Sequence, residues 1–252
     1  MLPTERHKKI LTLLASKEIV TIPEFIETFK ISIETVRRDL NTLDKNGKIK
    51  KVYGGAKLVD TISDEPDLKN RMTYKTQEKK AIARKCCEFI DDGDCIFIDS
   101  GSTTYQISNF LLGKKNLTII TNSIPVANQL IDTENEIILL GGHVRHQERS
   151  VVTTDYLFNF SELNIQKSFI CAGGITIANG LSDFDIQEVI TRKSIIERSK
   201  EIYVAVDSTK FDHDVTINVA PLSKIDYLIT DANLNSNIIN QLKMTQIKLI
   251  FA

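Results

Sequence analysis

The sequence predicts a mixed α/β protein with two domains: a small N-terminal domain of three helices and a β-hairpin, then a larger α/β domain. A length of 252 residues suits this division. Residues 1–57 carry a net charge of +5 and the remainder −6, which sum to −1. The small N-terminal domain, the head, is therefore basic and the larger domain acidic. Beyond the head, short apolar runs alternate with helix-like segments, which is typical of a parallel sheet covered by helices. We expect domains at 1–57 and 73–252, joined by a linker at 58–72.

The overall composition excludes several classes of protein. Apolar residues make up 42% of the chain and charged residues 26%, as in ordinary globular proteins. The sequence has no run of 18 or more apolar residues and no signal-peptide core at its N-terminus. Its cysteines form no C-x-x-C pair, so we expect reduced thiols. We expect a cytoplasmic protein without a metal, a cofactor or a membrane contact.

The segment from Ser32 to Leu43 predicts a short amphipathic helix. Ser32 is a favourable N-cap, because its hydroxyl can accept a hydrogen bond from an N–H of the first turn. Val36, Leu40 and Leu43 recur at i, i+4 and i+7, so they share one face. Gly47 follows at a position where a helix can end.

The opposite face of this helix carries Glu34, Arg37, Arg38 and Asn41. Arginine and asparagine have the side chains best shaped to bind guanine and adenine edges in a DNA major groove. An ordinary surface helix has a similar polar face, and the segment taken alone fits both interpretations.

The flanking sequence favours the DNA-binding interpretation. Residues 21–24 match the S/T-x-x-E capping box with a proline in the first turn, and predict a helix over 22–29. An apolar stripe predicts an earlier helix over about 4–16, and alternating lysines and apolar residues before paired glycines predict a hairpin at 48–56. These elements together make a winged helix-turn-helix domain, and its basic charge favours contact with phosphates.

The second domain alternates strand-like and helix-like segments. Its apolar runs predict buried strands, and the amphipathic segments between them predict helices. The expected strands are 95–99, 117–121, 137–140, 168–172, 202–206, 225–230 and 248–251, and the expected helices are 76–90, 103–112, 124–131 and 185–199.

Polar residues follow four of the expected strands, at the edge where ligands bind in open α/β sheets. The first strand runs into a loop at 99–104, whose hydroxyls and free N–H groups before a helix favour an anion such as phosphate. Other strands end at Thr121-Asn122-Ser123, at Gly141-Gly142 and at Asp207 to Phe211. Each loop could be a simple capped turn, but their recurrence at successive strand ends favours one shared cleft.

Several motifs resemble the DeoR family of bacterial transcriptional regulators. In the head they are Thr35-Val36-Arg37-Arg38-Asp39-Leu40 and Tyr53-Gly54-Gly55-Ala56; later ones are Ile98 to Thr104, Thr121-Asn122, Leu140 to Gly142, Asn179 to Ser182 and Asp207 to Phe211. The resemblance covers nearly the whole chain. It implies a repressor of sugar catabolism that binds a double-stranded DNA operator as a homo-oligomer, a dimer or tetramer, and is released by a phosphorylated sugar. It also implies a second domain similar to sugar-phosphate isomerases such as ribose-5-phosphate isomerase.

The matching positions define two candidate sites. We expect Arg38 and Asn41 at bases, Arg37 at bases or phosphates, and the hairpin lysines at the DNA backbone. The DNA-binding set is Ser32, Thr35, Arg37, Arg38, Asn41, Lys50, Lys51, Tyr53 and Lys57. The resemblance implies that residues 100–104 hold the phosphate, and that Glu188 contacts hydroxyls or simply pairs with Arg192 at i+4. The effector set is Asp99, Ser100, Gly101, Ser102, Thr103, Thr104, Asn122, Gly142, Glu188 and Lys210.

Two alternatives stay open. An isomerase would need a carboxylate base, but the Asp-Gly-Ala-Asp-Glu loop of such isomerases is absent, and Asp183 and Asp185 are more typical of helix caps. We therefore expect no catalytic residue. An activator is the second alternative, because the sequence does not fix where the operator lies. Thr153-Thr154-Asp155 and Cys171 also depart from the family pattern, which commonly has glycines there, and they leave the particular sugar open.

Overall fold

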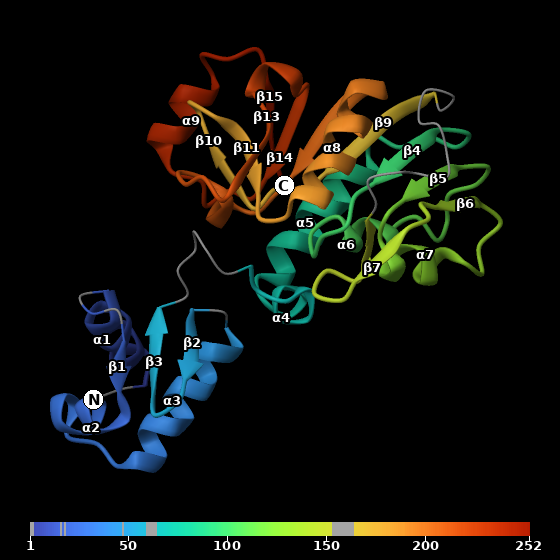
Figure 1. The fold of residues 1–252 in the computed structure, drawn as a ribbon. Coiled ribbons are helices and arrows are strands. Elements are labelled where there is room, and N and C mark those ends of the chain that lie inside the picture. Colours follow the sequence, from blue (N-terminus) through green and yellow to red (C-terminus); the bar gives the residue numbers. More distant parts are fainter. Residues whose placement is uncertain (1–2, 16, 18, 47, 59–64, 153–163) are drawn as a thin grey trace. The chain divides into compact units, whose positions relative to one another are not determined.

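The computed structural model describes residues 3–252 apart from positions 16, 18, 47, 59–64 and 153–163 (Figure 1). Its contacts divide the chain into two compact units, Met1–Tyr74 and Lys75–Ala252. Gly47 and the segment Thr153-Thr154-Asp155, both singled out from the sequence, lie outside the described residues. We describe the two units, the head and the sensor unit, one at a time.

The stretch expected as a linker is partly helical. Helix α4 (Leu68–Thr73) lies at its end, and Leu68 is only 1% exposed. Removing a leucine side chain from water stabilises the segment that carries it. This burial explains why the chain forms a helix where the sequence, with a proline and little periodicity just before it, predicted a linker.

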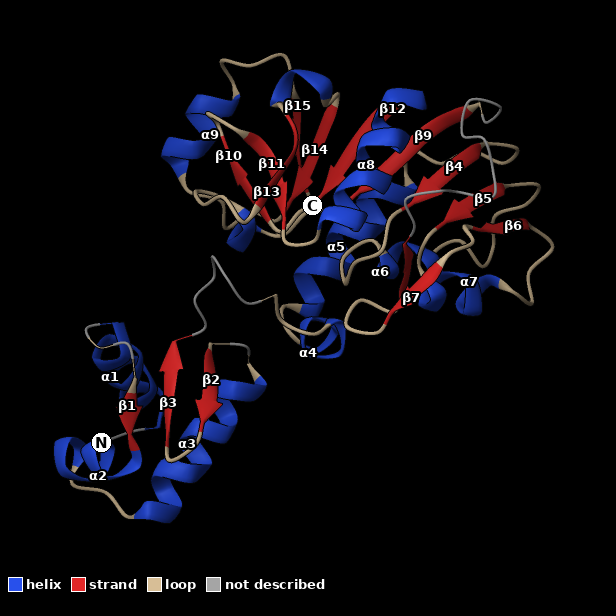
Figure 2. Cartoon of the chain, in the orientation of Figure 1, coloured by secondary structure: helices blue, strands red, loops and turns tan. Residues whose placement is uncertain are grey.

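Residues 3–58 of the head, apart from positions 16, 18 and 47, have the predicted architecture of three helices and a hairpin (Figure 2). Its strands form an antiparallel sheet in the order β1-β3-β2. The elements are α1 (Pro3–Ala15), β1 (Val20–Thr21), α2 (Ile22–Phe29), α3 (Ile33–Lys45), β2 (Ile49–Val52) and β3 (Gly55–Leu58).

The helix starts in the head follow from local sequence. Thr21 and Glu24 form the reciprocal capping box at the start of α2. Ser32 caps α3, because its hydroxyl accepts a hydrogen bond from Thr35 N at 3.3 Å. Both caps were predicted, and each satisfies a backbone N–H that has no partner within its own helix.

The predicted apolar face of α3 is confirmed. Val36, Leu40 and Leu43 are buried in one cluster with Ile10 of α1 and Phe25 of α2. Because this face is committed to the core, the opposite face of α3 must point away from it.

The sensor unit is built on a seven-stranded sheet in which every neighbouring pair is parallel. Each of the expected apolar runs forms one of its strands. In spatial order they are β15 (Lys248–Phe251), β14 (Tyr227–Thr230), β12 (Ser199–Ala205), β9 (Ile165–Ile170), β4 (Cys95–Ile98), β5 (Thr118–Thr121) and β6 (Glu136–Leu139).

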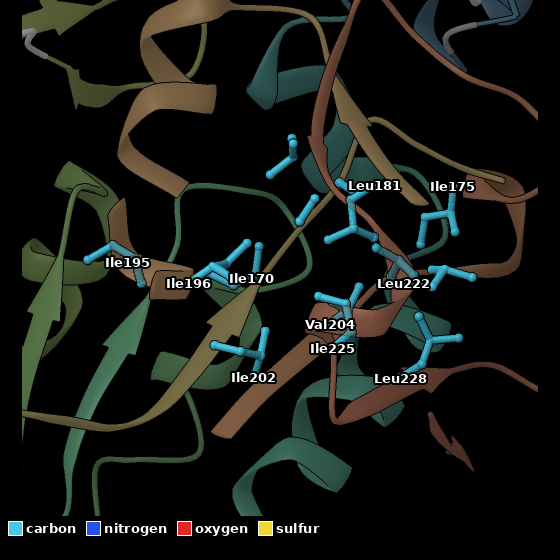
Figure 3. Close-up of a cluster of buried hydrophobic side chains, with 14 of the residues drawn as sticks. Ile170, Ile175, Leu181, Ile195, Ile196, Ile202, Val204, Leu222, Ile225 and Leu228 are labelled. Carbon is cyan, nitrogen blue, oxygen red and sulfur yellow. The ribbon is translucent and has the colours of Figure 1, made fainter. Parts of the chain in front are cut away.

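Helices cover both faces of this sheet. One layer consists of α5 (Thr76–Cys87), α6 (Tyr105–Ser108) and α7 (Ile124–Leu130), and the other contains α8 (Ile186–Arg198) and α9 (Ser236–Leu242). Successive strand residues point to opposite faces, so Ile96 and Ile98 pack toward the first layer and Phe97 toward the second. Figure 3 shows part of the second layer, where Ile196 of α8 lies beside Ile170 of β9. None of the helices in the described residues is long and apolar enough to cross a membrane.

The sequence did not reveal several small elements. They are the hairpin β7 (His143–Arg145) and β8 (Ser150–Val152), the antiparallel sheet of β10 (Gly174–Thr176), β11 (Gly180–Asp183) and β13 (Ile217–Ala220), helix α9, and the 3₁₀ turns η2 (Ser208–Lys210) and η3 (Leu222–Lys224). These strands are only three or four residues long, too short to establish a period-2 pattern. The helix expected at 103–112 is shorter, because turns replace both of its ends.

Strands β4 and β9 meet where the strand order reverses. From β4 the chain proceeds outward through β5 and β6, and from β9 it proceeds in the other direction through β12, β14 and β15. The loops after β4 and β9 therefore leave the sheet in opposite directions at its carboxyl edge. This position is where ligands bind in open α/β sheets.

Candidate DNA-binding face and effector site

The polar face of α3 is open to solvent. Arg37, Arg38 and Asn41 are exposed, as their positions opposite the apolar face predicted. Among the described residues, no carboxylate pairs with Arg37 or Arg38. Both guanidinium groups therefore keep their planar set of five donors for an external partner.

Asp39 holds this face in a fixed rotation about the helix axis. Arg6 of α1 reaches its carboxylate through Nε at 2.5 Å and Nη2 at 3.0 Å, and His7 Nε2 lies 3.0 Å away. Arg6 and Asp39 are 6% and 3% exposed. Burial raises the pKa of Asp39, but hydrogen bonds and charge from Arg6 and His7 outweigh burial, and the net result is a lowered pKa.

The β2–β3 hairpin concentrates positive charge. Lys50 and Lys57 lie directly opposite each other in the antiparallel pair. Like charges in such a pair destabilise a hairpin, and a polyanion relieves their repulsion. Tyr53 is fully exposed at the tip, next to Gly54 with a φ of +77° that favours glycine.

The hairpin and α3 enclose a small cleft. Lys51 of β2 bridges its two walls, because its Nζ donates to Asn41 Oδ1 of α3 at 2.8 Å. The cleft has a volume of about 250 Å³ and is lined by Ile22, Arg37, Leu40, Asn41, Lys51, Val52 and Gly55. Three of the expected DNA contacts, Arg37, Asn41 and Lys51, thus share one surface.

In the sensor unit, the loop after β4 presents a row of backbone donors. Ser100 N donates to Asp99 Oδ1 at 2.8 Å and to Asn122 Oδ1 at 2.9 Å. In the described part of the chain, no hydrogen bond has the N–H of Gly101, Ser102, Thr103 or Thr104 as its donor. The loop is nevertheless buried, with Ser102 and Thr103 each 5% exposed. Successive unpaired N–H groups of this kind form an anion-binding concavity.

Cys171 packs against this loop from the end of β9. Its Sγ donates to Ser100 O at 2.8 Å, and a Cβ at Gly101 would lie only 2.7 Å from that sulfur. An alanine at position 101 would therefore require the Cys171 side chain or the loop itself to shift. Cys171, at a position where the family pattern commonly has glycine, thus restricts which side chain fits at position 101 of the loop.

Glu188 accepts hydrogen bonds from the polar side chains beside the loop. Its Oε2 accepts from Ser100 Oγ at 3.1 Å and from Asn122 Nδ2 at 3.2 Å, and its Oε1 accepts from Ser150 Oγ. Arg192 Nη2 lies 4.0 Å from Glu188 Oε2, so the expected pairing of Glu188 with Arg192 at i+4 is present, while its expected contact with effector hydroxyls stays a prediction. Burial raises the pKa of Glu188, and the charge of Arg192 opposes that shift.

Arg192 lies among three buried carboxylates. Its Nε is 2.5 Å from Asp99 Oδ2 and its Nη1 is 2.7 Å from Asp183 Oδ2, in addition to the contact with Glu188. One guanidinium therefore faces three acidic groups. Their attraction raises the pKa of Arg192 well above its usual value even though burial opposes it.

The hairpin β7–β8 covers the start of α8. Arg145 Nε is 3.2 Å from Asp185 Oδ2, and Arg145 Nη1 is 3.8 Å from Glu188 Oε1. Asp185 is the N-cap of α8, accepting from Gln187 N and Glu188 N. The expectation that Asp185 is a helix cap is confirmed, whereas Asp183 pairs with Arg192.

The expected effector residues do not all join one network. Hydrogen bonds link Asp99, Ser100, Asn122 and Glu188, with the loop through Thr104 beside them. Gly142 follows β6, is exposed, has a φ of +150°, and takes no part in these hydrogen bonds. Lys210 ends the turn η2 after β12 and is half-buried.

The sequence did not single out several groups in or near this network. Ser150 and Arg145 lie in a hairpin with no visible periodicity, and Asp183 closes a strand only four residues long. Only Arg192 had a detectable signal, its i+4 spacing from Glu188.

A basic winged helix-turn-helix head joined to an α/β unit with a polar site at its sheet edge defines a ligand-responsive transcriptional regulator. Two family descriptions match the chain: DeoR-like helix-turn-helix domain over residues 6–62, and DeoR C terminal sensor domain over residues 74–232. The chain belongs to the DeoR family and is a DNA-binding transcriptional regulator.

Similar proteins carry regulator names. The glycerol-3-phosphate regulon repressor of Escherichia coli (strain K12) is 35% identical over 233 residues, which is 92% of each chain. The HTH-type transcriptional regulator IolR of Bacillus subtilis (strain 168) is 35% identical over 223 residues, 88% of each chain. Among solved structures, a D-ribose-5-phosphate isomerase in complex with phospho-erythronic acid has a TM-score of 0.41 and 19% identity, covering 54% of each chain.

Proposed function

We propose that this regulator represses a sugar-catabolism operon and is released from its operator by a phosphorylated sugar. The row of unpaired N–H groups from Gly101 to Thr104 is the observation that carries the proposal. A phosphate dianion supplies several acceptor oxygens to such a row without needing a counter-charged side chain. The name of the E. coli relative, a regulon repressor, supports repression over activation.

The sugar itself lies along the carboxyl edge of the sheet. Asn122 and Glu188 lie beside the phosphate loop, are buried, and are both hydrogen-bonded to Ser100, so in this proposal they hold the loop in place next to the sugar. Lys210 follows β12, two places from β4 in the sheet. Strands are spaced by about 4.8 Å, so that lysine is within reach of the far end of a sugar phosphate.

The head supplies operator binding. Arg38 and Asn41 contact base edges from the exposed face of α3, Arg37 contacts a base or a phosphate, and the hairpin contacts the backbone through Lys50, Lys57 and Tyr53. Ser32 and Thr35 lie at the N-terminus of α3, where hydroxyls and N–H groups suit a phosphate. A homo-oligomer, dimer or tetramer, places two heads on two half-sites and multiplies their affinity.

The sensor unit does not act as an isomerase in this proposal. A general base must direct a free lone pair at the substrate. Asp99 and Asp183 are paired with Arg192, and Glu188 accepts hydrogen bonds from three side chains. These ion pairs and hydrogen bonds fix the three carboxylates in position, which is typical of a binding site.

The test is anisotropy binding of the full chain to the DNA upstream of its own gene, titrated with a panel of sugar phosphates. One member is expected to weaken binding by about 5–150-fold, the usual range of coupling between two sites. The unphosphorylated form of the same sugar is the matched control and is expected to have no effect. Tight operator binding that no sugar phosphate weakens would contradict the proposed effector and leave the proposed DNA binding in place.

A second assay separates regulator from enzyme. The full chain is incubated with ribose 5-phosphate and with the sugar phosphate that releases DNA, and isomerisation is followed by the appearance of the ketose. We expect no turnover above the buffer control. Turnover that disappears with Glu188→Gln would favour the isomerase alternative.

A further inference from the structure

Lys51 of the hairpin fixes the orientation of the Asn41 side chain on α3. The two atoms in contact are Lys51 Nζ and Asn41 Oδ1, 2.8 Å apart. An ammonium group has three donors and no acceptor, so it can face only the oxygen of a carboxamide. Asn41 Nδ2, the donor end of the amide, is therefore turned away from Lys51.

Asp44 holds Lys51 in this position. Its Oδ1 accepts from Lys51 N at 3.3 Å, and its Oδ2 lies 3.8 Å from Lys51 Nζ. Asn41 and Asp44 are three residues apart, on neighbouring turns of the same helix face. The lysine is thus anchored by its backbone and drawn by charge toward the helix, beside the amide that it orients.

The two purines present different patterns in the major groove. Adenine offers an acceptor at N7 and a donor at N6, and an asparagine reads both when its oxygen and nitrogen are both available. Guanine offers acceptors at N7 and O6 only. An Asn41 whose oxygen accepts from an ammonium keeps a second lone pair and its Nδ2 donors, but the nearby positive charge repels the N6 hydrogens of adenine and leaves the donor contacts favoured.

We propose that Lys51 is a specificity-determining residue that acts through Asn41, restricting it to donor contacts and so favouring guanine over adenine at one operator position. The proposal rests on the proposed DNA-binding face of α3. It replaces the expectation that Lys51 contacts the DNA backbone. Loss of a backbone contact would weaken binding to all sequences alike. Lys50, the adjacent lysine on the same strand, keeps that backbone role.

The test compares Lys51→Met with Lys50→Met in the full chain, using operator duplexes in which each base pair is changed in turn. Methionine keeps the length of the side chain and removes the ammonium. Lys51→Met is expected to shift the preference at a single position from G·C toward A·T by about tenfold. Lys50→Met is expected to lower affinity for every duplex by the same factor and to flatten the salt dependence.

A third variant isolates the amide. In Asn41→Ala, a further Lys51→Met change should leave the preference at that position unaltered, because no carboxamide remains to be oriented. If Lys51→Met instead reproduces the uniform loss seen with Lys50→Met, the orienting role is wrong. If the unmodified chain shows no base preference anywhere in the operator, the DNA-binding face itself is wrong, which is a separate and recognisable failure. Circular-dichroism melting of each variant checks that the head remains folded.

Discussion

Two buried arginines, one in each unit, have opposite electrostatic surroundings. Arg6 in the head meets one carboxylate, Asp39, through two of its nitrogens. Arg192 in the sensor unit meets three, Asp99, Asp183 and Glu188, and balances only one of them. Both arginines are nearly inaccessible to water.

The difference separates a balanced ion pair from a network with unbalanced charge. The Arg6–Asp39 pair is balanced in charge and joins two helices, so it has no electrostatic need of a third group. The network around Arg192 keeps an excess of negative charge beside the loop at 99–104, where we propose that the effector binds. A buried arginine thus forms a neutral pair in the head and leaves negative charge uncompensated in the sensor unit. Each prediction below tests that difference.

Arg192→Met has the largest expected effect. It leaves three buried carboxylates without a counter-charge, and breaking a buried ion pair typically costs about 3–5 kcal/mol. Calorimetry of the full chain should show a lower unfolding temperature for the sensor unit. Arg198→Met, an exposed position on the same helix, is the control and should change stability by less than about 0.5 kcal/mol. Equal effects of the two variants would contradict the structural importance of the network.

Arg6→Met is expected to destabilise the head by about 3 kcal/mol, because Asp39 is left buried with only His7. The double variant Arg6→Met with Asp39→Leu should recover most of that loss, since a balanced buried pair can be replaced by apolar groups of similar size. Thermal melting of the head transition measures both. Lys9→Met removes an exposed pair with Glu5 and should be nearly neutral. Because Arg192 faces three carboxylates, we expect no single second substitution to restore the stability lost in Arg192→Met. A single substitution that did so would contradict the contrast between the two sites.

Gly101→Ala is expected to weaken the effector response about tenfold or more while operator binding persists. Its Cβ would lie 2.7 Å from Cys171 Sγ, so the loop and its row of N–H groups must shift. Anisotropy with and without the effector measures the response. Gly113→Ala is a matched control, because nothing lies within 4 Å of a Cβ there. Adding Cys171→Gly should restore the response, and failure to do so would show that the thiol is not the obstruction.

The smallest expected effect is a pH dependence of opposite sign in the two units. The pKa of Glu188 is raised above 4.5 in the folded chain, so its contribution to stability falls as pH rises through the window above 4.5. The pKa of Asp39 is lowered below 3.8, so its contribution is lost as pH falls through the window below 3.8. Urea midpoints from pH 2 to 7 should show a smaller slope above pH 4.5 for the sensor unit in Glu188→Gln and a loss of stability below pH 3.8 for the head, with the exposed Glu197→Gln unchanged as control. An unaltered slope in Glu188→Gln would contradict the shift.

The sequence was most informative where structure follows from neighbouring residues. The caps at Thr21 and Ser32 and the apolar face of α3 are local patterns, and the structure confirms them. Strands such as β4 were also predictable, since burial on both faces makes an unbroken apolar run.

The sensor site was predictable only in part, for a physical reason. The loop from Asp99 to Thr104 is contiguous, so its small polar residues before a helix were visible in the sequence, and its binding of an anion stays a prediction. Ser150 joins Glu188 from 38 residues away, and no local pattern records such a contact. The helical α4 was missed for the same reason, because the burial of Leu68 depends on tertiary packing.

The facing lysines of the wing give salt two opposing effects on this head. Lys50 and Lys57 repel each other across β2 and β3, and dissolved ions screen that repulsion and steady the free hairpin. The same ions weaken attachment to DNA, because releasing the counterions of the phosphates into a more concentrated salt solution gains less entropy. At low salt, the repulsion between the two lysines and the attraction of both to phosphate are therefore strongest together.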